Sequence, residues 1–151
     1  MIKPRKAKTK DAMYIQALLK KYSVEGDLLI RSLEDIYRNI RDFYVLSDSR
    51  GVHGVVALHV YWEDLAEVRS FVVDKKYRGK GLGEKLVEMT LKEAKHLGVK
   101  KVFALTKIPE YFKKKGFKNT LRKHLPQKIW KDCLACPKFT NCDETAVIKN
   151  I

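Results

Sequence analysis

The segment "DKKYRGKGLGEKLVEM" (residues 74–89) places three glycines within five positions, flanks them with cations and continues into a helical pattern. It directly follows the apolar run "FVV" (71–73), which predicts a buried strand. A turn rich in glycine between a strand and an amphipathic helix is typical of α/β units. The segment therefore predicts a strand, a loop and a helix in that order.

A second strand completes this unit. The helix begins at residue 81 and stops at Gly98, and its apolar stripe consists of Leu82, Leu86, Val87, Met89, Leu91 and Ala94. The run "KKVFALT" (100–106) then predicts a strand. Because consecutive strand, helix and strand form a parallel pair with a right-handed crossover, we expect two parallel neighbouring strands.

Two helices are predicted before this unit and one after it. "DAMYIQALLKKY" (11–22) has Met13, Ala17 and Leu18 at helical spacing, with Asp11 as the N-cap. "SLEDIYRNI" (32–40) opens with Ser32 and Asp35 at the positions of a loose capping box, and Ile36 and Ile40 line one face. Residues 109–117 predict a short helix that starts at Pro109.

The remaining apolar runs predict antiparallel strands. Residues 43–62 contain two strands around the turn formers of residues 47–51, residues 66–74 form a third, and 145–150 form the last. The fold class is therefore α/β, with a mixed and mostly antiparallel sheet, a central parallel pair and flanking helices. The absence of repeats and linkers in 151 residues predicts one domain over residues 1–151.

The charge of the chain is strongly positive. Its 32 Lys and Arg against 18 Asp and Glu give +14, a field that attracts nucleic acid, acidic membranes or phosphorylated and carboxylated small molecules. A lysine-rich surface without a ligand is the alternative. No zinc-finger or RNP signature occurs, so nucleic acid stays a runner-up. No membrane span or signal peptide is evident in the sequence, and we expect a cytoplasmic protein.

The chemistry of the glycine segment favours an anionic ligand. A loop that enters a helix directs backbone N–H groups, and about half a positive charge from the helix dipole, toward whatever lies before the helix. Glycines at 79, 81 and 83 allow close approach and positive φ, and Arg78 and Lys80 add charge. We therefore predict a phosphate or pyrophosphate ligand.

The spacing separates this loop from other phosphate-binding loops. The dinucleotide and nucleotide-triphosphate patterns do not fit, whereas Arg78, Gly81 and Gly83 give Arg-x-x-Gly-x-Gly. This pattern, together with the order of elements over nearly the whole chain, resembles the GNAT acyltransferase superfamily. The resemblance implies acetyl-coenzyme A as co-substrate. Its pantetheine arm would lie on Val72 and Val73, and its pyrophosphate on the backbone of Arg78, Gly79, Lys80, Gly81, Leu82 and Gly83.

Several segments further resemble N-acetylglutamate synthase in its short form. They are "LLIRS" (28–32), "EVRSFVVDKKYRGKGLGEKLV" (67–87), "LTKIPEYFKKKGF" (105–117) and the tail (125–147). This resemblance implies acetyl transfer to the α-amino group of L-glutamate, the first step of arginine biosynthesis. Arg31 and Arg69 are then natural partners for the carboxylates of an acidic amino acid, with Lys107 as a third cation. Surface salt bridges are the alternative for both arginines.

The acid–base groups of the reaction follow from the same resemblance. The resemblance implies that Glu67 is the general base, directly or through water, and a structural glutamate paired with an arginine is the alternative. Many superfamily members have a Tyr four residues before the Gly of a Gly-Phe pair, where this chain has Phe112. The neighbouring Tyr111 is the candidate general acid, with solvent or the incoming ammonium as other proton sources.

The three cysteines Cys133, Cys136 and Cys142 allow a structural metal, a disulfide or free thiols, and we assign no metal site. Other acceptors also stay open, namely another amino acid or a protein or peptide amine. A binding module for coenzyme A or nucleic acid without catalysis is the alternative outside enzymes. The sequence leaves the oligomeric state open, a homodimer included.

Overall fold

The computed structural model describes residues 2–23, 31–121, 124–125 and 144–151. It contains a seven-stranded sheet with the strand order β1-β2-β3-β4-β5-β7-β6. The strands are β1 (Lys3–Lys6), β2 (Phe43–Asp48), β3 (Gly51–Trp62), β4 (Leu65–Val73), β5 (Lys101–Thr106), β6 (Lys118–Asn119) and β7 (Thr145–Asn150). β4 and β5 are parallel, whereas β1–β2, β2–β3, β5–β7 and β6–β7 are antiparallel. The predicted mixed sheet with a parallel pair is therefore confirmed.

The contacts within the chain define two compact units. Unit 1 comprises residues 1–58 and 68–93, and unit 2 comprises residues 59–67 and 94–151. The backbone of β3, of β4 and of the long helix α3 (Leu82–Leu97) continues from one unit into the other. Whether residues 1–151 act as a single domain stays a prediction. None of the helices in the described ranges is long and apolar enough to cross a bilayer.

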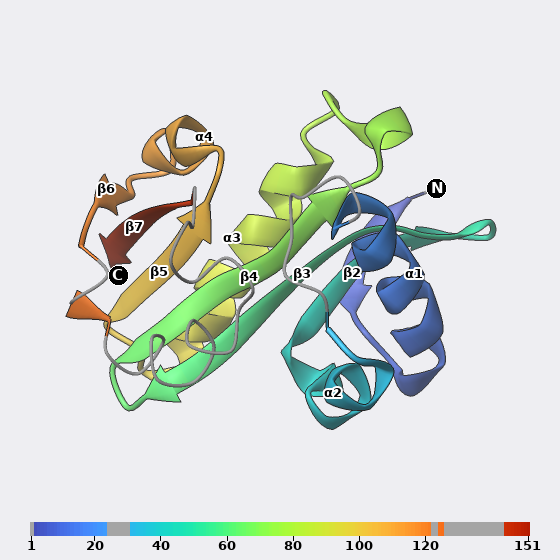
Figure 1. Ribbon diagram of the computed structural model, residues 1–151, viewed down its shortest axis with the longest axis horizontal. Helices are drawn as coiled ribbons and strands as arrows, with labels where there is room; N and C mark the ends of the chain where they lie inside the picture. The colour runs from blue at the N-terminus through green and yellow to red at the C-terminus, as the bar shows by residue number, and fades with distance from the viewer. Residues whose placement is uncertain (1, 24–30, 122–123, 126–143) are drawn as a thin grey trace. The chain divides into compact units, whose positions relative to one another are not determined.

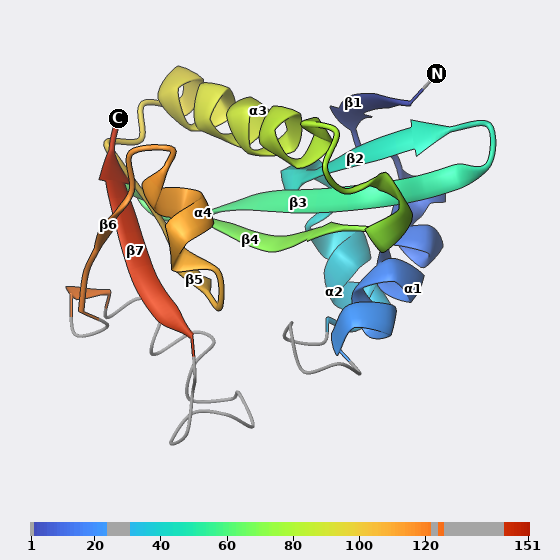
Figure 2. The ribbon, with the colours of Figure 1, turned by 90° about the horizontal axis from the view of Figure 1, so that it is seen from above.

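In unit 1, helices cover both faces of the strands. Figures 1 and 2 show α1 (Ala12–Ser23) and α2 (Leu33–Arg38) on one face of β2 and β3, and the first turns of α3 on the other. The core between the strands and α1 and α2 contains Ala12, Ile15, Leu18, Leu19, Tyr22, Ile36, Phe43, Val45, Val55, Ala57 and Val72. Ser32 caps α2 as predicted, because its hydroxyl accepts the Asp35 N–H at 3.0 Å.

The buried face of α1 differs from the prediction. Met13 is 65% exposed and Ala17 is exposed, whereas Ile15, Leu19 and Tyr22 are buried together with the correctly predicted Leu18. Both sets have helical spacing, but the second offers more large apolar side chains. The helix therefore turns that stripe toward the core, since burial of apolar area is the larger favourable term.

The predicted N-cap of α1 is also wrong. Asp11 ends a 3-10 turn (Thr9–Asp11) and is buried, and its carboxylate accepts the backbone N–H of Lys8 at 2.7 Å. The Arg5 guanidinium donates to both carboxylate oxygens, at 2.8 and 3.0 Å. The partners of Asp11 are thus residues that precede the helix. By binding Arg5 and Lys8, Asp11 holds the segment that leads into α1.

In unit 2, β5, β7 and β6 carry the short helix α4 (Pro109–Lys113), which contacts β6 and β7. The core there includes Leu65, Phe103, Leu125 and Ala146. Pro109 stands in the first turn of α4 as predicted, but the helix ends at Lys113 rather than at residue 117. Gly116 has φ of 93°, a left-handed conformation that breaks the helical pattern before Phe117.

Strands β1 and β6 were not predicted. β1 consists of Lys3, Pro4, Arg5 and Lys6, and it pairs with β2 at the edge of the sheet. A charged segment with a proline has no strand signature, but an edge strand tolerates both because one side of its backbone needs no partner strand. β6 has two residues and is too short to give a pattern.

Candidate active site

The glycine loop, residues 78–83, is held at its start by hydrogen bonds to the end of β4. A 3-10 turn (η3, Lys75–Tyr77) precedes the loop, and the Asp74 side chain caps it by accepting the Lys76 N–H at 3.2 Å. Arg78 then folds back, and its Nε donates to the carbonyl oxygen of Val73 at 2.7 Å. The strand end and the loop start therefore form one hydrogen-bonded structure.

Two of the three glycines have backbones that favour glycine. Gly79 and Gly81 have φ of 81° and 76°, in the left-handed region. A Cβ built at either position meets no atom within 4 Å, so both glycines border open space. The expectation of positive φ is wrong for Gly83, which lies in the first turn of α3.

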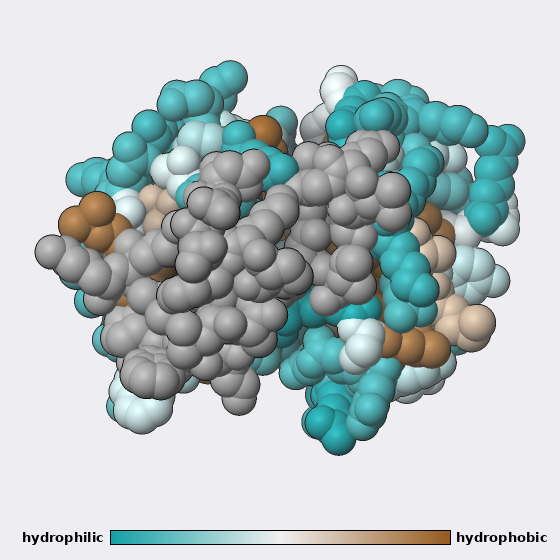
Figure 3. Space-filling model, in the orientation of Figure 1, coloured by the Kyte–Doolittle hydropathy of each residue, from teal (hydrophilic) through white to brown (hydrophobic). Residues whose placement is uncertain are grey.

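The N-terminus of α3 is exposed, with the cations Arg78 and Lys80 before it and the acidic Glu84 in its first turn. Residues 78–81 are exposed, whereas Leu82 is buried and anchors the first turn of this 16-residue helix. The Lys80 ammonium lies 5.8 Å from the centre of the Tyr77 ring. Figure 3 shows that hydrophilic residues, in teal, cover much of the described surface on the face in view. Free N–H groups, the helix dipole and fixed cations at one place favour an anion.

Helix α1 contributes two side chains that hold η3. The Tyr22 hydroxyl accepts the backbone N–H of Lys75 at 2.9 Å, and the Arg78 guanidinium lies 5.1 Å from the centre of the Tyr22 ring. Lys21 forms a salt bridge with Asp74 at 3.2 Å. Burial raises the pKa of Asp74, but the Lys76 N–H and the Lys21 ammonium outweigh it, and the net pKa is lowered.

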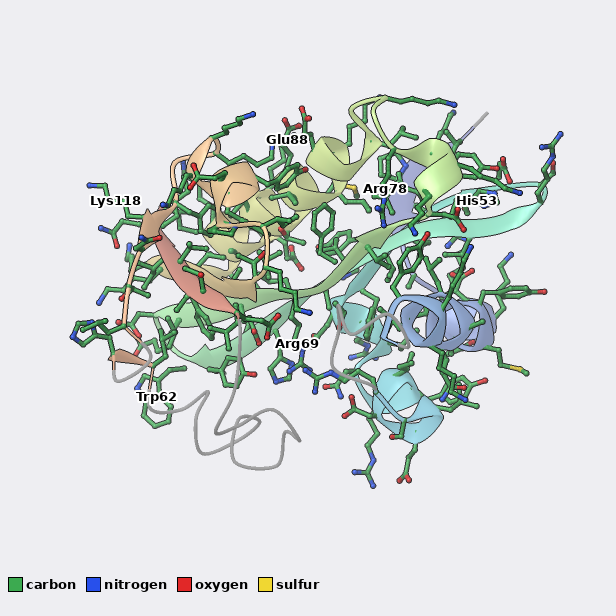
Figure 4. All side chains as sticks on the ribbon, turned by 45° about the horizontal axis from the view of Figure 1, so that its top comes forward. His53, Trp62, Arg69, Arg78, Glu88 and Lys118 are labelled. Atoms are coloured by element: carbon green, nitrogen blue, oxygen red, sulfur yellow. The ribbon has the colours of Figure 1, made fainter. Side chains whose placement is uncertain are left out.

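Strand β3 holds the same turn from another direction. The His53 ring stacks on the Tyr77 ring, with 4.2 Å between centroids and 17° between planes. His53 Nε2 lies 2.7 Å from Asp48 Oδ1, and this hydrogen bond, followed by the Arg50 N–H, lowers the pKa of Asp48. Figure 4 shows His53 near the start of β3 and Arg78 beyond the end of β4.

Sequence reasoning missed Tyr22, Asp48 and His53 as residues that support the loop. Tyr22 and His53 lie at least 20 positions from η3 in the sequence, and their contacts with it depend on how α1 and β3 pack against β4. Asp48 acts through His53, its partner across the turn between β2 and β3. The one local signal is that Tyr22 has a polar hydroxyl at the end of a buried stripe. A buried tyrosine hydroxyl needs a hydrogen-bond partner, which makes such a residue a candidate for a tertiary contact.

The predicted acceptor-binding arginines Arg31 and Arg69 belong to unit 1. Both are half-buried, and the Nε atom of each is fully buried. Arg69, labelled in Figure 4, precedes Ser70, whose φ of 54° is left-handed inside a strand. Such a backbone conformation in a residue other than glycine costs about 1 to 3 kcal/mol and occurs preferentially at functional sites.

The predicted base, Glu67, belongs to unit 2 and is 2% exposed. The Tyr61 hydroxyl, on β3, donates to Glu67 Oε1 at 3.1 Å. The Tyr61 ring in turn contacts the rings of His59 and Phe103, at 4.9 and 5.7 Å between centroids. Glu67 is therefore a buried carboxylate with a defined orientation.

The other predicted residues of unit 2 lie in and beside α4. Tyr111 is half-buried with a buried hydroxyl, and Phe112 is buried against Phe117 with 5.3 Å between the ring centroids. Lys107 is exposed in the turn between β5 and α4. Phe112 therefore has a packing role at the position where many superfamily members have the tyrosine. Cys133, Cys136 and Cys142 lie outside the described residues.

Comparison with known proteins places this geometry in a family. The model of the acetyltransferase (GNAT) family matches residues 12–117. An N-acetyltransferase of Chlorobaculum tepidum whose function is uncharacterized is 41% identical over 97% of this chain and 95% of its own length. An amino-acid acetyltransferase of Mycobacterium tuberculosis is 37% identical over 75% of this chain and 66% of its own length.

Solved structures show the same fold. N-acetylglutamate synthase from Neisseria gonorrhoeae, solved with coenzyme A and N-acetyl-glutamate, superposes with a TM-score of 0.88 at 25% identity. The match covers 99% of this chain and 35% of the synthase chain. A Mycobacterium tuberculosis protein solved with CoA gives a TM-score of 0.82 at 25% identity and covers 99% of both chains. The family model and the Chlorobaculum relative together establish that this chain belongs to the acetyltransferase (GNAT) family.

Proposed function

We propose that this chain is an amino-acid N-acetyltransferase that transfers acetyl from acetyl-CoA to the α-amino group of L-glutamate. The observation that carries the proposal is the glycine loop, in which Gly79 and Gly81 have left-handed φ at the exposed N-terminus of α3. The gonorrhoeal synthase and the Mycobacterium structure were both solved with CoA, which supports CoA as the ligand.

Acetyl-CoA is a substrate whose pyrophosphate suits this loop. The backbone N–H groups of residues 79–83 would donate to the phosphate oxygens, while Lys80 and Arg78 supply charge. The pantetheine arm would follow the backbone of Val72 and Val73, whose side chains are buried and hold the strand in place. The protein thereby positions the thioester carbonyl for attack by the amine.

The reaction requires one proton acceptor. The neutral α-amine attacks the thioester carbonyl carbon, a C–N bond forms, the C–S bond breaks and the CoA thiolate leaves. Glu67 accepts the proton that the amine loses, directly or through water, and Tyr61 holds its carboxylate in place. Tyr111 is the proposed donor of a proton to the thiolate.

The acceptor is the finer part of the proposal. Arg31 and Arg69 carry guanidinium groups with buried Nε atoms, which suits them to bind carboxylates with little competition from water. Lys107 is the third proposed cation. The name of the Mycobacterium relative, an amino-acid acetyltransferase, supports an amino acid as the acceptor. The match covers 35% of the gonorrhoeal synthase chain, so the activity of that whole protein is not transferred with it.

Kinetics of arginine variants test the acceptor. Loss of a guanidinium group leaves a carboxylate of the substrate without its partner, which costs about 2 to 5 kcal/mol. Arg31→Ala and Arg69→Ala should therefore raise the KM for glutamate by more than about tenfold, with the KM for acetyl-CoA unchanged. Replacement by Lys should restore part of the loss, since a point charge cannot reproduce the guanidinium fork.

Arg38→Ala is the matched control, because Arg38 is an exposed arginine of unit 1 whose salt bridge with Glu34 lies on the surface of α2. It should leave both KM values unchanged. If the Arg31 and Arg69 variants behave like Arg38→Ala, glutamate is not bound as proposed. Acetylation of a peptide amine in preference to glutamate would exclude glutamate as the acceptor, and only the general acetyltransferase activity of the family would remain.

A further inference from the structure

His53 contacts the entrance of the glycine loop in two ways. Its ring stacks on the ring of Tyr77, the last residue of η3, and its carbonyl oxygen accepts the backbone N–H of Asp74 at 2.8 Å. Tyr77 directly precedes Arg78, where the glycine loop begins. One residue of β3 therefore contacts both ends of the turn that leads into the loop.

The orientation of the His53 ring is itself fixed. Asp48 Oδ1 lies 2.7 Å from His53 Nε2, and the same oxygen accepts the backbone N–H of Arg50 at 2.8 Å. The side chains of His53 and Asp48 are 14% and 18% exposed. The hydrogen bond to Asp48 orients the imidazole ring, and the stack in turn orients the Tyr77 ring.

The glycine loop depends on contacts from neighbouring residues because its glycines have no side chains that could hold it in place. Gly79 and Gly81 carry no side chains, and atoms added there would meet nothing within 4 Å. Glycine also loses more conformational freedom than any other residue when it becomes ordered. A loop held at its entrance before the ligand arrives loses less entropy on binding, and this raises affinity.

We propose that His53 is a positioning residue for the cofactor: through its stack on Tyr77 it preorganises the glycine loop for the pyrophosphate of CoA. The inference rests on the proposed function, because it takes the loop as the CoA site. It assigns His53 to cofactor affinity alone. The step that forms the amide and the affinity for the acceptor are therefore independent of this side chain.

Binding of CoA by variants of His53 tests the inference in the full chain. Loss of an aromatic pair corresponds to about threefold to tenfold in affinity, so His53→Leu should raise the Kd for CoA in calorimetric titration by that factor. His53→Phe keeps a ring that can stack and should stay closer to the wild type. His96→Leu is the control, because His96 is an exposed histidine near the C-terminal end of α3. It should leave the Kd unchanged.

Kinetics separate positioning from general damage. His53→Leu should raise the KM for acetyl-CoA by the same factor as the Kd for CoA, with kcat and the KM for glutamate unchanged. Tyr77→Leu should have a similar effect. The double variant should bind CoA as tightly as either single variant, since each single substitution already removes the same stacking contact. Additive losses would overturn the inference.

The outcomes distinguish this inference from the function it rests on. If the wild-type chain does not bind CoA, the proposed function and the inference fail together. If the wild type binds CoA and a folded His53→Leu binds it equally well, only the inference fails. Should His53→Leu not fold, the comparison of Tyr77→Leu with the wild type decides, since an unchanged Kd for CoA there also contradicts the stack.

Discussion

Substitution of Gly81 tests whether the glycine loop binds CoA. The φ of 76° at Gly81 disfavours any side chain, and the open space beside it is where we place the pyrophosphate. Gly81→Val should therefore weaken CoA binding by at least about tenfold while the fold is kept. Calorimetric titration gives the affinity, and circular dichroism checks the fold.

Gly98→Ala is the matched control for this variant. Gly98 has φ of 89° at the end of α3, and a Cβ there also meets nothing within 4 Å. This substitution should cost about 1 kcal/mol of stability through the same backbone strain and leave CoA binding unchanged. Equal affinities of the Gly81→Val and Gly98→Ala variants would show that the loop does not bind CoA.

Asp11 gives a prediction about stability and pH. The Arg5 guanidinium lowers the pKa of Asp11, and the Lys8 N–H adds to this effect against the opposing effect of burial. Because the pKa is lower in the folded state, the stabilisation is fully present above the unfolded value of about 3.9. It is lost as the pH falls through the folded value.

Asp11→Asn should therefore cost about 1 to 3 kcal/mol at pH 7. The difference from the wild type should shrink as the pH falls below about 4. Urea unfolding at several pH values measures both effects. A difference that is independent of pH would mean that the ion pair with Arg5 contributes nothing as a charge pair.

The sequence predicts residues whose signal is local and misses those whose role depends on distant contacts. Arg78 and Gly81 could be assigned to a loop because their spacing and their place before a helix lie within one segment. His53 and Tyr22 could not, since their partners lie more than 20 positions away. The roles of Glu67 and Arg69 stay predictions.

At the scale of elements, the register of β2 against β3 gives a further prediction. Gly54 faces Leu46 across this pair, and a Cβ on Gly54 would lie 2.7 Å from Leu46 Cδ1. Both residues are buried, so Gly54→Ala should destabilise the protein by about 1 to 3 kcal/mol through overpacking. Denaturant unfolding measures the loss.

A second variant makes this test specific. Leu46→Val removes the atom at 2.7 Å, so in its background Gly54→Ala should cost less than it does in the wild type. If the two effects simply add, Leu46 does not face Gly54 and the register is different.

Periodicity explains which elements were predicted well. The apolar stripe of α3 and the stop at Gly98 predict the bounds of this helix closely, and the predicted bounds of β7 are the observed ones. In α1 two stripes compete, and only packing decides that Ile15 rather than Met13 is buried. β1 gave no signal, because its place at the edge of the sheet lets polar residues and Pro4 form a strand.

At the scale of the whole molecule, we expect one cooperative unfolding transition. The backbone of β3, β4 and α3 continues from unit 1 into unit 2, so unfolding of one unit removes part of these elements from the other. Calorimetry should give equal calorimetric and van't Hoff enthalpies. Two separate transitions would contradict the prediction that residues 1–151 act as one domain.

A thiol-release assay with acetyl-CoA and a panel of acceptors tests the proposed acetyl transfer to L-glutamate most directly. The panel contains L-glutamate, L-glutamine, L-aspartate and a peptide with a free N-terminus. L-Glutamate should give the highest kcat/KM, by about tenfold or more over the peptide, because the proposed cations bind the two carboxylates of an acidic amino acid and a peptide N-terminus has no α-carboxylate. A higher kcat/KM for the peptide, or CoA binding with no thiol release in the presence of any acceptor, would contradict the proposed function.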